Sequence, residues 1–248
     1  MKIDVLDHGY VRFIEAWGHG EYAQLVQHSV GHTETVRDME AGIIEAARQS
    51  TQGSFRGWEQ DAKLLEHLYS NQHMTPFEQA GMTIEVQAPI FVFREWHRHR
   101  TQSYNEMSAR YAPLPDLYYT PDHGSILLRL GNKKNKQSGA AVDREPAPDE
   151  VDAWVEGLQA IYSQLEDFYK DALALGIPKE LARITMPVGH YSRMRASANL
   201  RNWLAFMTLR CAPNAQYEIR QFADAVGQVI AETFPRTHNL WVEESTRV

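Results

Sequence analysis

The chain lacks the features that would place it in several large classes of protein. Its 248 residues include one cysteine, Cys211, so neither an internal disulfide nor a cysteine-based zinc site can form. The longest uninterrupted apolar run, residues 88–93, is far shorter than the roughly 18 residues of a membrane helix. No apolar stretch follows the start MKIDVLDHG, so we expect no signal peptide, no membrane partner and a cytoplasmic protein.

An excess of positive charge is also missing. The 25 lysines and arginines are outnumbered by 32 acidic residues, giving a net charge of −7. This balance argues against bulk nucleic-acid binding, although it does not exclude a local basic cluster. Hydrophobic residues make up 43% and charged residues 23%, as in ordinary globular proteins. The length fits one or two domains, and we expect one compact domain over residues 1–248.

The hydrophobic periodicity predicts an α+β fold in which a small antiparallel sheet packs with several helices. Alternation on either side of residues 7–9 predicts a hairpin over residues 3–14. Residues 82–88 alternate and predict a half-buried strand, after which Pro89 begins a helix that runs to residue 100. Spacings of three and four predict five further helices, over residues 35–49, 58–69, 151–175, 199–210 and 215–234.

Residues 131–150 interrupt this pattern. They are rich in Gly, Pro, Lys and small residues, and we expect a mobile surface insertion there. The helix predicted after them ends at Gly176 and Pro178 and carries a strict 3-4 stripe over three heptads. Such a stripe suits packing against another helix, within the subunit or across a subunit contact. Its members are Val151, Trp154, Leu158, Ile161, Leu165, Phe168, Ala172 and Leu175.

The unusual residues concentrate between residues 94 and 111. This segment holds four arginines and two histidines but only two acids, in a chain that is otherwise acidic. Arginine keeps its charge at every relevant pH, and its planar fork matches an oxyanion such as phosphate. A solvated basic helix end is the equally plausible structural alternative. The i, i+2 spacing of His97 and His99 does not suit one face of a helix, so we expect no metal site.

Two further clusters flank this segment. In the first, residues 73–78, Thr75 is expected to cap a helix with Pro76 at its first position and Glu78 completing a capping box, which leaves His73 free. The second is Asn199, Arg201 and Arg210, where an isolated Arg210 is more simply a cation at a helix C-terminus. Next to it, Cys211 is more commonly a buried structural thiol than a nucleophile.

These residues together resemble the flavin-dependent thymidylate synthases. The signature of that family is Arg-His-Arg, seven residues and a Ser, which corresponds here to Arg98-His99-Arg100 and Ser108. The likeness extends to SYNEMSARY around it, HMTPFE before it, ELARITMP and TLR after it, and the opening MKIDVLDHG. It covers essentially the whole chain outside residues 125–150.

The resemblance implies a fold, a reaction and an assembly. Members of the family are homotetramers whose active sites are built at subunit contacts. They methylate dUMP to dTMP, taking the carbon from methylenetetrahydrofolate and the reducing equivalents from NADPH through bound FAD. By position, the implied FAD contacts are Thr75, Arg98, His99, Arg100, Glu106, Asn199 and Arg201. His73 and Glu78 correspond to residues near the flavin and the folate or water route.

The implied dUMP contacts overlap with these. They are Glu95, Trp96, His97, Arg98, Glu106, Met107, Ser108, Ala109, Arg110, Arg183 and Arg210. In this family no cysteine nucleophile is needed, so Arg210 is the expected catalytic group, stabilising the ionised pyrimidine. Ser108 is expected to donate a hydrogen bond to phosphate or uracil. Glu95 often corresponds to Gln, and Ala205 to a flavin-contacting Asn in some members, which puts both contacts in doubt.

Two other functions fit part of the pattern. The basic segment could bind single-stranded nucleic acid, with Tyr104 and Tyr111 stacking on bases. Alternatively, a flavin- and folate-dependent enzyme could methylate uridine in RNA instead of free dUMP. A flavin spectrum would exclude the first alternative, and the substrate would distinguish the second.

Overall fold

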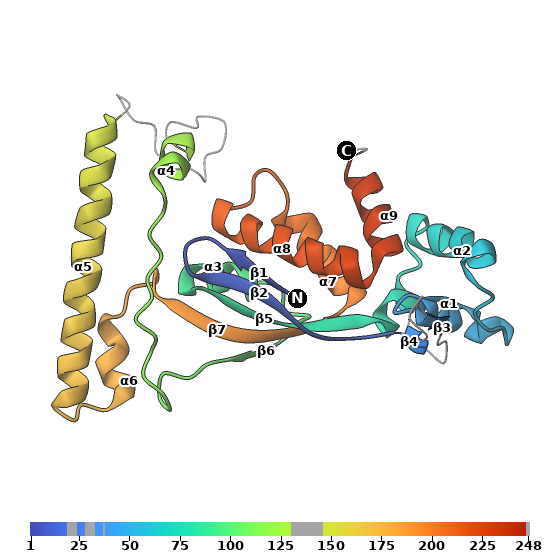
Figure 1. Cartoon of the computed structure of the whole chain (residues 1–248), viewed down its shortest axis with the longest axis horizontal. Coiled ribbons are helices and arrows are strands. Elements are labelled where there is room, and N and C mark those ends of the chain that lie inside the picture. The colour runs from blue at the N-terminus through green and yellow to red at the C-terminus, as the bar shows by residue number, and fades with distance from the viewer. Residues whose placement is uncertain (19–23, 28–32, 37, 130–145, 247–248) are drawn as a thin grey trace.

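The computed structural model describes residues 1–18, 24–27, 33–36, 38–129 and 146–246 (Figure 1). The predicted α+β fold class is confirmed, because one antiparallel sheet of five strands packs with several helices. A separate two-stranded sheet pairs β3, Gln24–Gln27, with β4, Thr33–Val36. The five strands follow the spatial order β1 (Lys2–Val5), β2 (Gly9–Trp17), β5 (Gly81–Pro89), β7 (Tyr191–Asn199) and β6 (Ser103–Glu106).

The predicted N-terminal hairpin is confirmed as β1 and β2, joined by a tight turn. Leu6 takes a left-handed conformation in this turn, with φ of 58°. Gly9 ends the turn where a Cβ would lie 2.6 Å from the Val5 carbonyl oxygen and 2.7 Å from the Phe222 ring. Only glycine fits such a close approach. The hairpin therefore depends on this glycine as well as on its alternating pattern.

Strand β5 is more buried than its alternation predicts. It is the central strand, paired on both edges with β2 and β7, and two of its three polar members, Thr83 and Glu85, are only 9% and 8% exposed. Neighbouring strands satisfy both groups. The Thr83 hydroxyl donates to Ser197 at 3.1 Å, and Glu85 accepts from Tyr10 and Arg12 at 2.8 and 2.9 Å. The prediction of a half-buried strand was wrong because sequence alternation does not show which strand is central.

Two predicted helices are shorter than expected. Helix α1 spans Ala41–Arg48 instead of beginning at residue 35, because Thr33–Val36 forms strand β4, in keeping with the β-branched residues in that segment. Helix α3 spans Ile90–Trp96 and does not continue to residue 100. The chain must reverse direction between α3 and β6, which pairs antiparallel with β7. Residues 97–102 make that reversal in turns.

The cluster at residues 73–78 also differs from its prediction. Helix α2, Trp58–Ser70, forms as expected and is followed by a 3₁₀ turn, Thr75–Gln79. Thr75 is the first residue of this turn rather than its cap, and no side-chain cap bond is present. The expected capping box was wrong because Glu78 forms an ion pair with Arg201 instead.

Two of the three helices that follow β7 cover one face of the sheet, and the third packs against the second of them and against α2 (Figure 1). Helices α7, Leu200–Arg210, and α8, Tyr217–Thr233, match the predicted pair, whereas α9, Pro235–Ser245, was not predicted. Buried Glu40 holds the start of α9 by accepting the backbone N–H groups of Thr237 and Arg236 at 2.6 and 3.1 Å. Burial raises the pKa of Glu40. This contact joins residues almost 200 positions apart, which local patterns do not reveal.

A second group of helices projects from the sheet at one end, at the left of Figure 1. We call it the arm: α4 (His123–Arg129), α5 (Pro148–Ala174), α6 (Lys179–Ala182) and the 3₁₀ turn Arg183–Thr185. Most of the predicted insertion, residues 131–145, lies outside the described residues. The prediction was wrong for residues 148–150, because helix α5 begins at Pro148. The α5 end was predicted correctly, and Gly176 follows it with φ of 78°.

Candidate functional site

The Arg98-His99-Arg100 sequence lies in the turns between α3 and β6. Backbone bonds form these turns, with His99 N–H donating to Trp96 O at 3.0 Å and Gln102 N–H donating to His99 O at 3.2 Å. The hydroxyl of Tyr104, on β6, lies 3.1 Å from Trp96 O and 2.8 Å from His99 O, so it can donate to either carbonyl. The side chains of Arg98 and Arg100 are exposed. The fold thus presents both guanidinium groups to solvent on a turn that Tyr104 holds.

Arg210 reaches from the end of α7 to this turn. Its Nε–H donates to His99 Nε2 at 2.9 Å, Nη1 donates to Glu95 Oε2 at 2.5 Å, and Nη2 donates to the Glu95 carbonyl at 2.9 Å. A guanidinium has five N–H donors, so two remain for a ligand. A cation that only stabilised its own helix end would not need these contacts with α3. The arrangement therefore fits an oriented donor better than a simple helix-end cation.

His99 is held neutral in this network. Burial lowers its pKa to about 4, and the nearby Arg210 charge acts in the same direction, while Glu95 opposes both. Because Nε2 accepts from Arg210, the ring proton belongs on Nδ1. The ring also packs edge-on against Phe206 with centroids 4.9 Å apart. His99 therefore positions Arg210 without adding a second positive charge.

The segment after the turn carries several predicted nucleotide contacts. The Glu106 carboxylate accepts from the Ser192 hydroxyl at 2.7 Å, and Met107 N–H donates to Arg193 O at 2.8 Å. Ser108 Oγ accepts from the Arg110 backbone N–H at 3.3 Å, which leaves its own proton for another partner. The fold thus ties this segment to β7 and leaves its polar groups near the turn.

Three positions around the turn and on α7 offer little to a ligand. The Trp96 ring is fully buried, and its Nε1–H donates to Gln102 Oε1 at 3.0 Å, so this ring cannot contact dUMP. Its burial supports the turn instead. Ala109 is 3% exposed and offers only its backbone. Ala205 is an exposed residue of α7 with no polar side chain, so the flavin contact made by an Asn in some family members cannot form.

The remaining predicted cofactor residues gather at the opposite end of α7. Asn199 caps this helix, and its Oδ1 accepts the Asn202 N–H at 3.0 Å. Arg201 forms its ion pair with Glu78, beside the turn that begins at Thr75. Nine residues of helix, about 13 Å, separate Arg201 from Arg210. His73 precedes the same turn, with its ring 5.8 Å from that of His67.

Arg183 lies in neither group. It is an exposed residue in the turn after α6, on the arm. Arg110 is linked to the same arm by an ion pair with Glu180 at 2.9 Å. His97 lies between the rings of Phe93 and Tyr104, at 6.1 and 4.8 Å from their centroids. Within the described part of the chain, no cluster of His, Cys, Asp or Glu is arranged to hold a metal ion.

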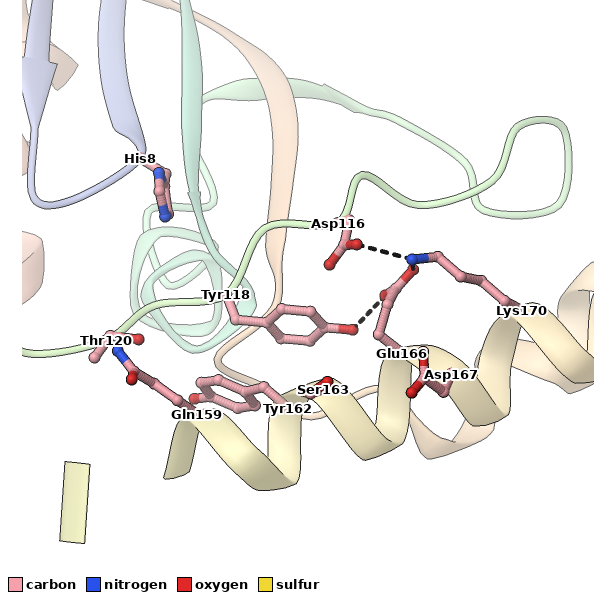
Figure 2. Close-up of a pocket in the computed structure, with 10 residues that line it drawn as sticks. All are labelled: His8, Asp116, Tyr118, Thr120, Gln159, Tyr162, Ser163, Glu166, Asp167 and Lys170. Carbon is pink, nitrogen blue, oxygen red and sulfur yellow. Dashed lines mark hydrogen bonds and ion pairs between the residues drawn. The ribbon is translucent and has the colours of Figure 1, made fainter. Parts of the chain in front are cut away.

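A pocket of about 340 Å³ lies elsewhere, between α5 and residues 116–120 (Figure 2). Its polar groups pair with one another: the Tyr118 hydroxyl donates to Glu166 at 2.6 Å, and Lys170 contacts Asp116 at 2.9 Å and Glu166 at 3.3 Å. None of the residues predicted to bind flavin or nucleotide lines this pocket. This pocket is therefore separate from the residues predicted to bind flavin and nucleotide.

Sequence reasoning missed two residues that shape the site. Tyr104 was considered only as a base-stacking group, but its hydroxyl bridges the carbonyls of Trp96 and His99. Ser192 was not considered, although it holds Glu106. Tyr104 lies inside the conspicuous segment, so proximity could have suggested it. Ser192 lies 86 residues from Glu106, and no local signal indicates that pair.

The chain is similar to known proteins over most of its length. Residues 24–236 match the family model described as thymidylate synthase complementing protein. Flavin-dependent thymidylate synthases from Wolbachia pipientis and Thermosipho melanesiensis are each 32% identical to the chain. The first alignment covers 96% of this chain and 75% of the relative, and the second covers 100% and 96%.

A solved structure supports the fold as well. It is a UMP/dUMP methylase, PolB, from Streptomyces cacaoi bound with 5-bromo-dUMP. This protein is 27% identical, with 97% of each chain covered and a TM-score of 0.76. Among the described residues, no helix is long and apolar enough to cross a membrane. From the family model and the near full-length relatives, we conclude that the chain belongs to the flavin-dependent thymidylate synthases and is an enzyme of that type.

Proposed function

We propose that the protein reductively methylates dUMP to dTMP, with methylenetetrahydrofolate as carbon donor, NADPH as reductant and FAD as its flavin. The observation that carries the proposal is the orientation of Arg210 by Glu95 and His99, which leaves two N–H donors free. Converting a methylene into a methyl group requires two electrons. If NADPH supplies them, the folate leaves as tetrahydrofolate and the reaction is balanced.

Arg210 acts on the pyrimidine. The C5 carbon of uracil is a weak nucleophile and must become electron-rich before it can accept a one-carbon unit. Donors fixed against a ring carbonyl stabilise the negative charge that develops there, and they are effective because they need not reorganise. Neutral His99 and the Glu95 contacts keep the Arg210 fork in place. No thiolate is required for this role.

The nucleotide phosphate would be bound by the exposed cations around the turn. Arg98 and Arg110 carry charge at every relevant pH, and Ser108 retains a hydroxyl donor. Arg183 would complete this group from the arm. Glu106, held by Ser192, would orient the sugar or base as a hydrogen-bond acceptor. Met107, His97 and Ala109 are close enough in sequence to contribute backbone groups or packing.

The residues present fit a flavin dinucleotide. Its diphosphate needs fixed cations and N–H donors, which the exposed Arg98 and Arg100 and the start of α7 provide. A cation in the first turn of a helix is unfavourable by itself, and the Glu78 carboxylate offsets this at Arg201. A diphosphate bound there would add a second anion beside the same guanidinium. Bound FAD would supply hydride chemistry, which no side chain of this protein can perform. His73, Thr75, Glu78 and Asn199 would contact it from the same end of α7.

We infer further that the active sites are shared between the subunits of a homotetramer. Arg98 and Glu106 are expected to serve both flavin and dUMP, which is difficult for a single copy of each residue. Arg210 and the Arg98-His99-Arg100 turn lie at the C-terminal end of α7, whereas Asn199, Arg201 and Glu78 lie at its N-terminal end. Two subunits could therefore supply complementary halves of one active site. Mixing inactive Arg100→Ala and Arg210→Ala proteins should then restore some activity, provided that subunits exchange. Mixtures that stay inactive despite demonstrated exchange would contradict sharing.

The first experiment is an absorption spectrum followed by a substrate test. Flavin bands in the purified protein and formation of dTMP from dUMP with methylenetetrahydrofolate and NADPH support the proposal. Arg98→Ala should remain folded but lose most of its flavin. Free UMP and a uridine-containing transcript serve as competing substrates, because PolB is described as a UMP/dUMP methylase. Methylation of the transcript alone, or a colourless protein that binds oligonucleotides, would overturn the proposal.

A further inference from the structure

The pocket between α5 and residues 116–120 is not used by any part of the proposed function. Its volume of about 340 Å³ lies within the range of small-molecule sites, roughly 300–1,000 Å³. All ten residues that line it carry a polar or charged group (Figure 2). An apolar ligand would take these groups out of water without giving them hydrogen bonds, which is costly. The pocket therefore suits a small polar ligand.

The lining of the pocket is negatively charged. It contains three carboxylates, on Asp116, Glu166 and Asp167, and one ammonium, on Lys170. With His8 counted as neutral, the formal charge of the lining is −2. Within the described part of the chain, Asp167 forms no ion pair that would neutralise it. A lining of this sign attracts a cation and repels an anion such as a nucleotide or a folate.

Lys170 shows that this lining accommodates an ammonium group. Its Nζ lies 2.9 Å from Asp116 Oδ2 and 3.3 Å from Glu166 Oε1. The Tyr118 hydroxyl donates to Glu166 Oε2 at 2.6 Å and so orients this carboxylate. The Glu166 side chain is only 7% exposed, whereas that of Lys170 is 56% exposed and flexible. Glu166 is therefore a fixed part of the pocket, and Lys170 is an occupant that a competing ammonium can displace into solvent.

Two tyrosine rings form one wall of the pocket. Tyr118 and Tyr162 stack with their centroids 4.7 Å apart and their planes at 20° (Figure 2). The Tyr162 hydroxyl donates to the Tyr119 carbonyl at 3.2 Å, and Gly189 leaves room for it, because a Cβ there would collide with this hydroxyl. The wall is thus in place before a ligand binds. Tyrosine rings attract organic cations through their negative faces.

We propose that this pocket binds a small aliphatic diamine in its doubly protonated form. One ammonium binds at Asp167, and the other takes the position of the Lys170 ammonium beside Glu166. The methylene chain between them lies against the two tyrosine rings. The two charges of the ligand match the formal charge of the lining. A metal ion suits the pocket less well, because no group of His, Cys, Asp or Glu among the described residues is arranged to hold one.

The first test is isothermal titration calorimetry of the full-length protein with 1,4-diaminobutane at constant ionic strength. The wild type should bind one diamine per chain, and 1,4-butanediol, which has the same length but no charge, should not bind. Asp167→Asn should weaken diamine binding about tenfold or more, because a charged hydrogen-bond acceptor is lost. Asp171→Asn is the matched control, since it makes the same charge change on α5 outside the pocket and should bind as the wild type does.

Three results of this titration would overturn the proposal. The first is a wild type that does not bind the diamine. The second is equal binding by Asp167→Asn and Asp171→Asn, which would show that the pocket is not where the diamine binds. The third is displacement of the diamine by an equal concentration of Mg²⁺, which would assign the pocket to a metal ion.

Lys170→Met tests whether the ligand takes the place of the lysine. Removing the internal ammonium should tighten diamine binding several-fold. Lys179→Met is the matched control, because Lys179 donates to the Tyr111 carbonyl and does not line the pocket. Unchanged or weaker binding by Lys170→Met, or the same tightening in Lys179→Met, would overturn the proposal.

Thermal unfolding gives a second readout. A ligand that binds only the folded protein raises its Tm, so the diamine should stabilise the wild type and not Asp167→Asn. An equal rise in both proteins would contradict binding in this pocket. Neither readout requires flavin or dUMP. Both can therefore be judged whether or not the protein forms dTMP.

Discussion

Two arginines lie at the opposite ends of α7 in contrasting surroundings. The Arg210 side chain is 15% exposed and donates to three acceptors on α3 and the turn after it. The Arg201 side chain is 53% exposed and forms one ion pair among the described residues, with Glu78. Exposed ion pairs contribute little to stability, whereas oriented donors in a shielded site strongly affect charge that develops beside them. The same residue type should therefore matter for different reasons at the two ends.

The helix itself adds to the contrast. Its C-terminal carbonyls favour a cation at Arg210, whereas its N-terminal amides disfavour one at Arg201. Arg210 is thus stable where it lies even without a ligand, and its fork is ready to bind. Arg201 benefits more from an anion that joins it at the helix start. In the proposed function, the C-terminal end would bind the pyrimidine and the N-terminal end a phosphate group.

The strongest test of this difference is Arg210→Lys. Lysine keeps the positive charge but cannot contact His99, Glu95 and a ligand with one planar fork. We expect a folded, flavin-bound protein whose dTMP turnover falls about 10²–10³-fold. Stopped-flow absorbance should show normal flavin reduction by NADPH without dUMP. It should also show slow reoxidation with dUMP and methylenetetrahydrofolate. Normal reoxidation with a normal dTMP yield would remove Arg210 from the mechanism.

Tyr104→Phe tests the turn that faces Arg210. The change removes one hydroxyl from the Trp96 and His99 carbonyls and keeps the ring. One hydrogen bond of this kind contributes about 0.5–1.5 kcal/mol, so flavin affinity should fall by up to about tenfold. Fluorescence titration of the apoprotein measures the change. Tyr118→Phe, which loses a bond to Glu166 on the arm, is the matched control and should bind flavin normally. Equal affinities in both variants would contradict a positioning role for Tyr104.

Acid should lower the free energy of unfolding through His99, which contacts Arg210 at the C-terminal end of α7. Its pKa is lowered from 6.5 to about 4 in the folded protein. As the pH falls, His99 is therefore protonated in the unfolded chain before it is protonated in the folded protein. The stability due to neutral His99 is complete above 6.5 and is lost as the pH falls through 4. Urea unfolding across this window should show a decline that is reduced in His99→Gln. An unchanged decline would assign it to other groups, such as His190 and His238, whose pKa values are also lowered by burial.

At the other end, Arg201→Gln should have a small effect on stability. The ion pair with Glu78 is largely exposed, so we expect the free energy of unfolding to fall by at most about 1 kcal/mol. Thermal unfolding of the flavin-free protein measures this directly. Glu78→Gln breaks the same pair and should give a matching value. A loss several times larger would mean that Arg201 is a structural residue and would weaken its assignment to the flavin.

How well the sequence predicts a feature depends on how far apart in the chain the residues that form it lie. The hairpin, α2, α5 and α7 depend on nearby residues, and all were predicted. The conspicuous Arg98-His99-Arg100 segment was also found from local composition. Its true setting in a turn was missed, because the antiparallel pairing of β6 with β7 ends α3 early. Alternation likewise could not show that β5 is central.

Contacts between distant residues account for the rest. The Glu95–Arg210 pair joins positions 115 apart, and Glu78 pairs with Arg201 across 123 residues. The second of these pairs replaced the capping box that local rules favoured at Thr75. Single residues also gave misleading signals, since Trp96 falls within the predicted dUMP contacts but its ring is fully buried. Residue type indicated the chemistry, whereas the fold decided which groups are accessible.

Cys211, the residue after Arg210, should show the smallest effect. Burial raises the pKa of its thiol to about 12, and nearby Asp224 acts in the same direction. A thiol with this pKa remains protonated at neutral pH, and the thiolate is the nucleophilic form. Cys211→Ala should therefore keep its flavin and nearly all of its dTMP formation in a steady-state assay beside Arg210→Lys. If turnover instead fell to background with flavin still bound, a thiolate would be needed, and the proposed role of Arg210 in replacing one would be wrong.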